Sequence, residues 1–171
     1  MASDTIQTIL SRRSVRRYKA DEIPREDLRM ILEAGRQAPS AGNRQPWHFV
    51  VVKEPRLKQQ VAAACNGQDW MAAADVILAG VGLPAVSRQF FVIDTAIALQ
   101  NVVLAAHSLG YGTCWIGSFD EPKVRELLGI PDAARVIGLT PVGVPAVEPE
   151  ARPRKEPSEI FSLDHYGEPL T

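Results

Sequence analysis

The chain has 171 residues, 46% of them hydrophobic and 23% charged, and its formal net charge is −1. This length suffices for one domain with a packed core, and the composition is that of a globular protein, so disorder of the whole chain is excluded. The near-neutral charge provides no general attraction to nucleic acid or to an anionic membrane.

Two helical patterns open the chain. The first covers residues 4–11, where Asp4 is a suitable N-cap and apolar residues follow at helical spacing. The second begins at Pro24, and its apolar residues recur at the i, i+3, i+4, i+7 positions of one face. This helix has to end before Pro39, because a proline disfavours the helical conformation of the residue before it.

Further along, short runs rich in valine and aromatic residues predict strands, and longer apolar runs predict helices. We expect strands at 47–52, 75–81, 112–117 and 135–144. We expect helices at 55–65, 90–109 and from Asp120 to Gly129. The helix 90–109 is apolar nearly all round but contains Asp94, Gln100 and His107, so it reads as a buried helix and not as a membrane span.

Strands and helices are mixed along the chain without simple alternation, which favours an α+β sandwich over a doubly wound parallel sheet. We expect a single domain over residues 1–171, since no linker or internal repeat is apparent. Residues 145–171, called the arm below, are rich in proline and charge and cannot fold alone. The N-terminus is not a secretory signal, and Cys65 and Cys114 lack motif spacing, so a cytoplasmic protein with reduced thiols is expected.

Residues 12–17, the basic segment, place four arginines around Ser14 and Val15. Such a cluster can be a solvated helix end favoured by the helix dipole, a nucleic-acid patch, or a phosphate site. Guanidinium groups bind phosphate oxygens in a bidentate manner, and a serine hydroxyl adds a donor. The chain shows no further basic face with interleaved aromatics, which argues against nucleic acid.

Residues 39–47, the carboxamide loop, place small residues, two carboxamides and a tryptophan around two prolines. This loop offers backbone and side-chain donors and acceptors that suit the rim of a flat heteroaromatic ligand. Together with the basic segment it suggests a flavin mononucleotide site, in which one part holds the phosphate and the other the ring.

The sequence shows no other motif typical of a nucleotide-binding, metal-binding or nucleophilic site. The chain has no G-x-G-x-x-G or G-K-[ST] sequence, so a nucleotide would be held by side chains and irregular loops. The three histidines lack metal-binding spacing, and no Ser-His-Asp or Cys-His set can be assembled. Either the protein is not an enzyme, or a bound cofactor carries the reactivity and no side chain is itself catalytic.

Three segments in the same order and spacing, 12–16, 38–47 and 109–117, resemble the FMN-dependent nitroreductase family, and the resemblance covers essentially the whole chain. It implies a nitroreductase-like fold with a central, mainly antiparallel sheet flanked by helices. It also implies an obligate homodimer with two FMN sites at the interface. The helix 90–109 would lie in the dimer core, and the arm would wrap around the partner subunit.

The resemblance also assigns residue roles. The phosphate and ribityl chain would be contacted by Arg12, Arg13, Ser14 and Arg16, with Arg154 and Lys155 as a second basic contact. The loop reaching the flavin from the other subunit would comprise Pro39, Ser40 and Asn43, with Gln45 near the ring or bracing the loop. Gln68 would face the pyrimidine edge, and Trp115, Ile116 and Gly117 would lie along the isoalloxazine.

The activity implied is that of an NAD(P)H-dependent flavin oxidoreductase, in which nicotinamide and then a nitroaromatic or quinone acceptor use the flavin in turn. Family relatives with other flavin chemistry, such as reductive dehalogenation, azoline oxidation or flavin fragmentation, are one alternative. A flavin-binding protein without turnover is another. The segment between Val81 and Phe90 is short for the family, so the helical cover over the substrate side is expected to be reduced or absent.

Overall fold

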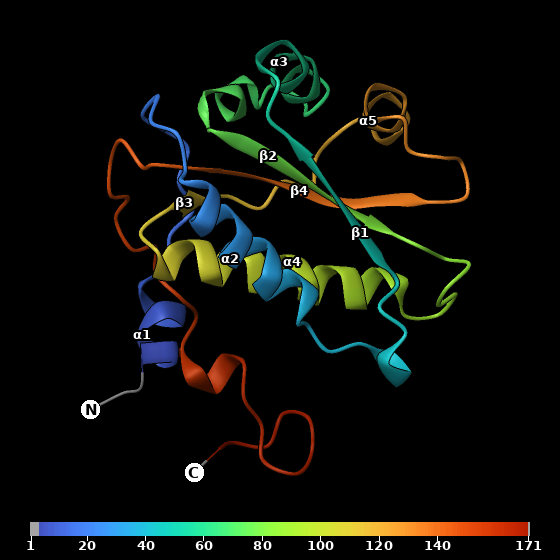
Figure 1. Cartoon of the computed structure of the whole chain (residues 1–171). Coiled ribbons are helices and arrows are strands. Elements are labelled where there is room, and N and C mark those ends of the chain that lie inside the picture. Colours follow the sequence, from blue (N-terminus) through green and yellow to red (C-terminus); the bar gives the residue numbers. More distant parts are fainter. Residues whose placement is uncertain (1–3, 171) are drawn as a thin grey trace.

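A four-stranded antiparallel sheet forms the centre of the fold in the computed structural model, which describes residues 4–170 (Figure 1). Its strands are β1 (Trp47–Val52), β2 (Val76–Gly82), β3 (Gly112–Thr113) and β4 (Arg135–Gly143). They lie in the order β1-β2-β4-β3, and each neighbouring pair is antiparallel. This arrangement confirms the α+β prediction with a mainly antiparallel sheet.

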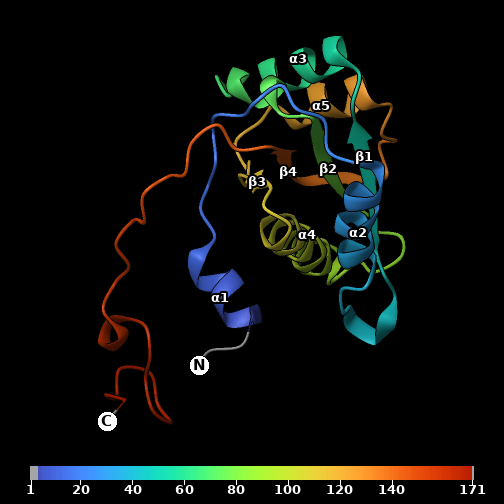
Figure 2. The ribbon, with the colours of Figure 1, turned by 60° about the vertical axis from the view of Figure 1, so that its left-hand side comes forward.

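Helices cover both faces of the sheet (Figure 2). One face carries α2 (Arg25–Arg36) and α4 (Phe91–Ser108), with α1 (Asp4–Ser11) beside the end of α4. The other face carries α3 (Pro55–Ala63) and α5 (Glu121–Leu128). A hydrophobic cluster fills each of the two layers, one around Ile77 and Leu139 and the other around Leu78 and Val142.

Local sequence explains why several elements begin and end where they do. All seven residues of β2 are buried, as expected for an unbroken apolar run in a central strand. The carboxylate of Glu54 accepts hydrogen bonds from two backbone N–H groups at the start of α3, and the Asp120 carboxylate accepts one from the Lys123 N–H at the start of α5. Gly129 ends α5 with a left-handed φ of 63°, a conformation in which a side chain would be strained.

The predicted strand 112–117 is wrong beyond Thr113. β3 ends there, and Ile116 returns to the sheet only as an isolated bridge, with its N–H donating to the Leu139 carbonyl at 2.9 Å. The register places Cys114 opposite Pro141, which has no N–H to donate to the neighbouring strand, so the ladder is interrupted at this pair. The Trp115 indole lies over β4, where a Cβ atom on Gly138 would be 2.9 Å from its ring.

The long helix α4 packs against the sheet through a close contact. A Cβ atom placed on Gly80 of β2 would lie 2.4 Å from Cδ1 of Leu99, and both residues are buried. α4 has the length and mean hydropathy (1.3) of a membrane span, yet it contacts α2, β2 and β4, which makes it a layer of this fold. Its outer side exposes apolar residues, including Val92, Ile93 and Ile97.

Gly80→Ala tests this contact. The added methyl group has to displace the Leu99 side chain in a packed core, so we expect the free energy of unfolding to fall by about 1–3 kcal/mol. Chemical denaturation monitored by circular dichroism measures the change. Gly117→Ala is the matched control, because a Cβ atom there meets nothing within 4 Å. Equal stability of the two variants would contradict the close packing of α4 on β2.

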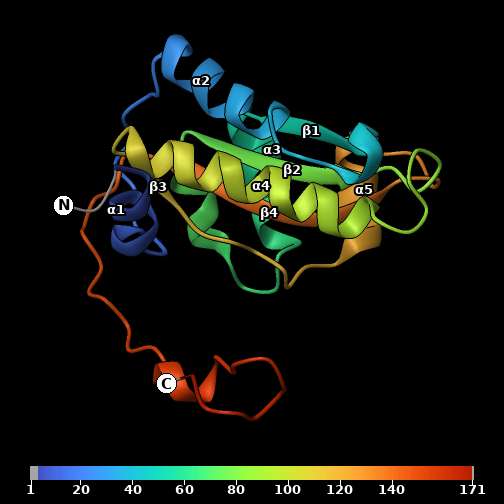
Figure 3. The same cartoon turned by 90° about the horizontal axis from the view of Figure 1, so that it is seen from below.

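The arm leaves the body of the molecule after a short paired stretch (Figure 3). The Ala146 N–H donates to the Arg17 carbonyl at 2.9 Å, and Tyr18 and Pro145 form an antiparallel bridge. From residue 151 to residue 170 every side chain is exposed, and the one helical turn is Pro157–Glu159. Exposed apolar residues such as Ile160, Phe161 and Leu163 lie on this segment.

Candidate functional site

The basic segment is tied to the edge of the sheet by its backbone. Ser14 forms a parallel bridge with Thr113 of β3, and the Val15 N–H donates to the Thr113 carbonyl at 2.8 Å. This approach is close enough that a Cβ atom on Gly112 would lie 2.8 Å from Val15. The glycine therefore allows the segment to lie directly against β3, and Val15 points into the core while its neighbours face outward.

Five guanidinium groups surround one pocket of about 170 Å³ beside this segment. Its lining residues come from the basic segment and the start of the arm, and they are Arg12, Arg13, Ser14, Arg16, Pro149, Glu150, Arg152 and Arg154. Glu150 is the single acidic residue among them. The predicted partners Arg12, Arg13, Ser14, Arg16 and Arg154 are thus brought together, whereas Lys155 is exposed and does not line the pocket.

Arg152 was missed by the sequence interpretation. The sequence signal for Arg152 is its spacing from Arg154, because side chains two residues apart in an extended chain point to the same side. A neighbouring pocket is lined by Arg12, Arg13, Arg152 and Arg154 together with Gln100 and Leu104 of α4. The cationic pocket therefore continues onto the middle of α4.

Gln100 was also missed, although a polar side chain in an otherwise apolar helix is itself a signal. Its Oε1 accepts a hydrogen bond of 2.9 Å from Nε1 of Trp115. Ile116 is buried and backbone-paired to β4, while Trp115 and Gly117 are exposed on either side of it. Residues 115–117 thus present an accessible stretch of backbone close to the second cationic pocket.

Gln68 lies beside this stretch. Asn66 and Gly67 turn the chain with φ angles of 49° and 83°, and Nδ2 of Asn66 donates to Oγ of Ser118 at 3.1 Å. The turn brings the Gln68 segment to the residues that follow Gly117. Oε1 of Gln68 accepts a hydrogen bond of 3.0 Å from Nε1 of Trp70.

The carboxamide loop is held in a tight conformation. Gly42, Asn43 and Gln45 have φ angles of 59°, 53° and 52°. The Gln45 N–H donates to Oγ of Ser40 at 2.9 Å, and its side-chain amide donates to the Asn43 carbonyl at 3.1 Å, so Gln45 braces the loop. Pro39, Asn43 and Gln45 are exposed and Ser40 is partly so. A left-handed glutamine is uncommon, and such strain is typical of ligand-binding loops.

The carboxamide loop and the basic segment lie at opposite ends of α4 (Figures 1 and 3). The Ala41 N–H donates to the buried Asp94 carboxylate in the first turn of α4. Ser11, just before the basic segment, is hydrogen-bonded to His107 in the last turn. Asp94 and His107 are separated by roughly 20 Å along the axis, at about 1.5 Å per residue. The two segments therefore do not meet within one chain.

His107 lies against the basic segment, with Nε2 2.8 Å from Oγ of Ser11. Burial, and then the guanidinium groups of Arg12 and Arg13, lower the pKa of His107 from its usual value, while Glu148 opposes the shift. The unfolded chain therefore binds this proton more readily than the folded one, so stability falls as the pH drops below about 6.5.

His107→Gln should remove this contribution. We expect the wild-type denaturation midpoint to decrease more between pH 7.5 and pH 5.5 than that of the variant. Urea denaturation at the two pH values provides the measurement. Identical pH slopes in both proteins would show that His107 is not the titrating group.

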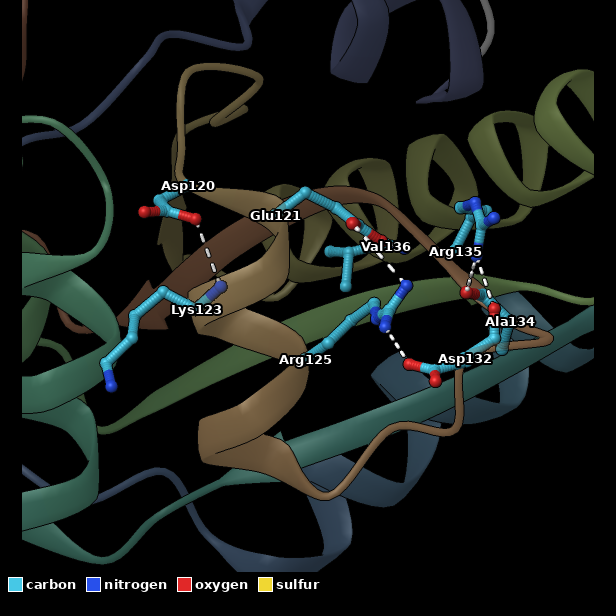
Figure 4. A network of polar contacts seen from close by, with 8 residues as sticks. All are labelled: Asp120, Glu121, Lys123, Arg125, Asp132, Ala134, Arg135 and Val136. Carbon is cyan, nitrogen blue, oxygen red and sulfur yellow. Dashed lines mark hydrogen bonds and ion pairs between the residues drawn. The ribbon is translucent and has the colours of Figure 1, made fainter.

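A second polar network, on the opposite face of the sheet, involves α5 (Figure 4). Arg125 pairs with Glu121 at 3.8 Å and with Asp132, which joins α5 to the loop before β4. The Val136 N–H also donates to the Glu121 carboxylate at 3.3 Å. These contacts connect α5 to β4, and we assign them a role in stabilising the fold. Within residues 4–170, no three His, Cys, Asp or Glu side chains gather in a group that could hold a metal ion.

The amino-acid sequence matches a known protein family over most of the chain. The model of the family described as "Nitroreductase family" matches residues 9–75 and 59–144. The chain belongs to the nitroreductase family. A relative from Archaeoglobus fulgidus, named as a putative NADH dehydrogenase/NAD(P)H nitroreductase, is 35% identical over 167 residues. That match covers 92% of this chain and 96% of the relative, so the similarity is not confined to the site.

Solved nitroreductases have the same fold. The crystal structure of a putative NADH dehydrogenase/NAD(P)H nitroreductase from Parabacteroides distasonis has a TM-score of 0.89 and 28% identity, and covers 96% of this chain and 100% of the other. The NADPH:FMN oxidoreductase from Vibrio harveyi, complexed with NAD⁺, has a TM-score of 0.89 and 27% identity, with 96% and 78% covered. The family and the nitroreductase fold expected from the sequence are therefore confirmed.

Proposed function

We propose that this nitroreductase is an FMN-dependent NAD(P)H oxidoreductase that transfers reducing equivalents to nitroaromatic, quinone or similar acceptors. The observation that carries the proposal is the pocket of five guanidinium groups in a chain with the nitroreductase fold. Contacts through Trp70 connect this pocket to Gln68, and Gln100 of the neighbouring pocket connects it to Trp115. The names of the relatives support it, since they include NADPH-flavin oxidoreductase and FMN reductase.

The residues of the pocket fit the phosphate of FMN. Forked guanidinium groups match the geometry of phosphate oxygens, and several of them neutralise a dianion in a partly enclosed site. Nη1 of Arg13 is already held by the Leu10 and Arg12 carbonyls at 2.9 and 3.0 Å, so this side chain is oriented before ligand binds. Ser14 adds a hydroxyl donor beside Arg13.

The accessible backbone at 115–117 and the amide of Gln68 fit a flat heteroaromatic ring. We assign Trp115, Ile116 and Gly117 to one side of the isoalloxazine and Gln68 to its pyrimidine edge. Ile116 gives this wall rigidity, because its backbone is bonded to Leu139 in both directions. Gly117 leaves room for close approach of a ligand, since a Cβ atom there would meet nothing within 4 Å.

A homodimer completes the site in this proposal. Ile93 and Ile97 are exposed on α4, and they share one helical face with Gln100 and Leu104. If two copies pack these faces antiparallel, the carboxamide loop of one lies near the arginine pocket of the other. Pro39, Ser40 and Asn43 would then reach the flavin bound to the partner. The arm, with its exposed apolar residues, would wrap around the same partner.

When bound, FMN supplies the hydride-accepting and hydride-donating chemistry that no side chain of this protein provides. The protein's residues bind the phosphate, orient the ring and place donors at its pyrimidine edge.

Residues 83–90 form turns and contain no helix. This agrees with the short segment between Val81 and Phe90 in the sequence and favours an acceptor side of the flavin that is open to solvent. Cys65 and Cys114 are buried free thiols, in keeping with a cytoplasmic protein.

The test is direct. Purified protein is expected to be yellow, or to become yellow with added FMN, and NADH or NADPH should bleach it under anaerobic conditions. Protein that takes up no FMN would overturn the proposal. Bound flavin that neither nicotinamide reduces rapidly would indicate a relative with other flavin chemistry, and reduction without transfer to any acceptor would indicate a flavin-binding protein.

A further inference from the structure

Trp70 connects the two ends of the proposed flavin site within one chain. Its Nε1–H donates to Oε1 of Gln68 at 3.0 Å, at the end assigned to the ring. Its indole face carries the guanidinium of Arg16, whose Cζ lies 5.9 Å from the ring centroid, at the end assigned to the phosphate. Trp70 itself has no assigned contact with FMN, so it acts through Gln68 and Arg16, which do.

The hydrogen bond from Trp70 determines which way the Gln68 amide points. An indole N–H is a donor only, so its partner has to be the amide oxygen. With the oxygen engaged, the NH₂ group of Gln68 is left to donate to a ligand. A freely rotating glutamine would present its oxygen to that ligand about as readily as its NH₂ group.

Trp70 is itself well supported. The Tyr18 ring stacks on it, with a centroid separation of 6.4 Å and an interplanar angle of 22°. The Tyr18 hydroxyl donates to the Val15 carbonyl at 2.7 Å, which ties the stack to the basic segment. Trp70 is also partly buried against the core beneath α3. The indole therefore has little freedom to leave Gln68.

We propose that Trp70 is a positioning residue that orients the Gln68 amide so that its NH₂ group donates to the pyrimidine edge of the flavin, and that it thereby raises the midpoint potential of the bound flavin. The physical reason is that reduction adds negative charge to this edge of the ring, and a fixed donor stabilises the reduced form more than the oxidised form. The inference rests on the proposed function.

The decisive variant is Trp70→Phe. Phenylalanine retains an aromatic face for Arg16 and Tyr18 but has no N–H, so the Gln68 amide is free to turn. We expect a lower midpoint potential of the bound flavin, measured by anaerobic titration against reference dyes, while FMN affinity changes by less than about tenfold. Gln68→Ala should lower the potential as well. In the Gln68→Ala background, Trp70→Phe should produce no further shift.

Tyr18→Phe is the matched control, because it retains the stacked ring and removes only the hydroxyl that bonds to Val15. Its flavin potential should equal that of the wild type. An unchanged potential in FMN-loaded Trp70→Phe, or the same shift with and without Gln68, would overturn the inference. So would an equal shift in Tyr18→Phe, which would indicate general loosening of the site.

If Trp70→Phe does not fold, Gln68→Ala tests the inference instead. An unchanged flavin potential in that variant would show that the Gln68 amide does not stabilise the reduced flavin, which would overturn the inference. Wild-type protein that takes up no FMN would overturn the proposed function together with this inference. Wild-type protein that binds FMN, with variants of unaltered potential, would overturn this inference alone. The two failures are therefore distinguishable.

Discussion

The Ile97→Glu variant is expected to purify as a monomer that retains no FMN. Ile97 is 37% exposed and Ile93 57% exposed on the face of α4 proposed as the dimer interface. Burial of an unpaired carboxylate there would cost on the order of 3–5 kcal/mol, which corresponds to a roughly 100- to 5,000-fold weaker dimer. Because the carboxamide loop and the basic segment lie at opposite ends of α4, the monomer would hold only half of each flavin site.

Size-exclusion chromatography with light scattering measures the oligomeric state, and visible absorbance measures the flavin content. Met30→Glu is the matched control, because Met30 is 45% exposed on α2, whereas the proposed interface is formed by α4 and the arm. It should remain dimeric and yellow. A dimeric Ile97→Glu protein with full flavin content would rule out the α4 interface, and a monomeric protein with full flavin content would rule out a site shared between subunits.

Arg12→Ala is expected to weaken FMN binding by about 1.5–3 kcal/mol, or roughly 10- to 150-fold in Kd. Arg12 lines both cationic pockets, so its guanidinium is placed to form charge-assisted hydrogen bonds with the phosphate. The measurement is a fluorescence titration of the apoprotein with FMN, since protein binding alters flavin emission.

Arg17→Ala is the control for Arg12→Ala. It makes the same change of charge five residues away in the same segment, but Arg17 is exposed and lines neither cationic pocket. Its FMN affinity should stay within about threefold of wild type, because an exposed charge at that distance is screened by salt. Equal losses in the two variants would mean that general positive charge, and not a phosphate contact by Arg12, holds the cofactor.

Where local rules sufficed, the sequence predicted the structure closely. The ranges 4–11 and 47–52 coincide with α1 and β1, because an N-cap followed by a helical apolar period, or a run of β-branched and aromatic residues, depends on near neighbours alone. The strand predicted at 112–117 is interrupted because Cys114 lies opposite Pro141, which has no N–H, and this pairing joins residues far apart in the chain. No local pattern reveals such a contact.

The sequence by itself determined the fold class, the family and the two segments proposed to hold the flavin, because these depend on residue types in order and at fixed spacing. Only the tertiary structure decided how these segments are placed. It brought Arg152 and Gln100 to the cationic pocket, connected Gln68 to Arg16 through Trp70, and separated the carboxamide loop from the arginines by most of the length of α4. The reason is that proximity depends on how the helices pack on the sheet, which the spacing of residues along the chain does not specify.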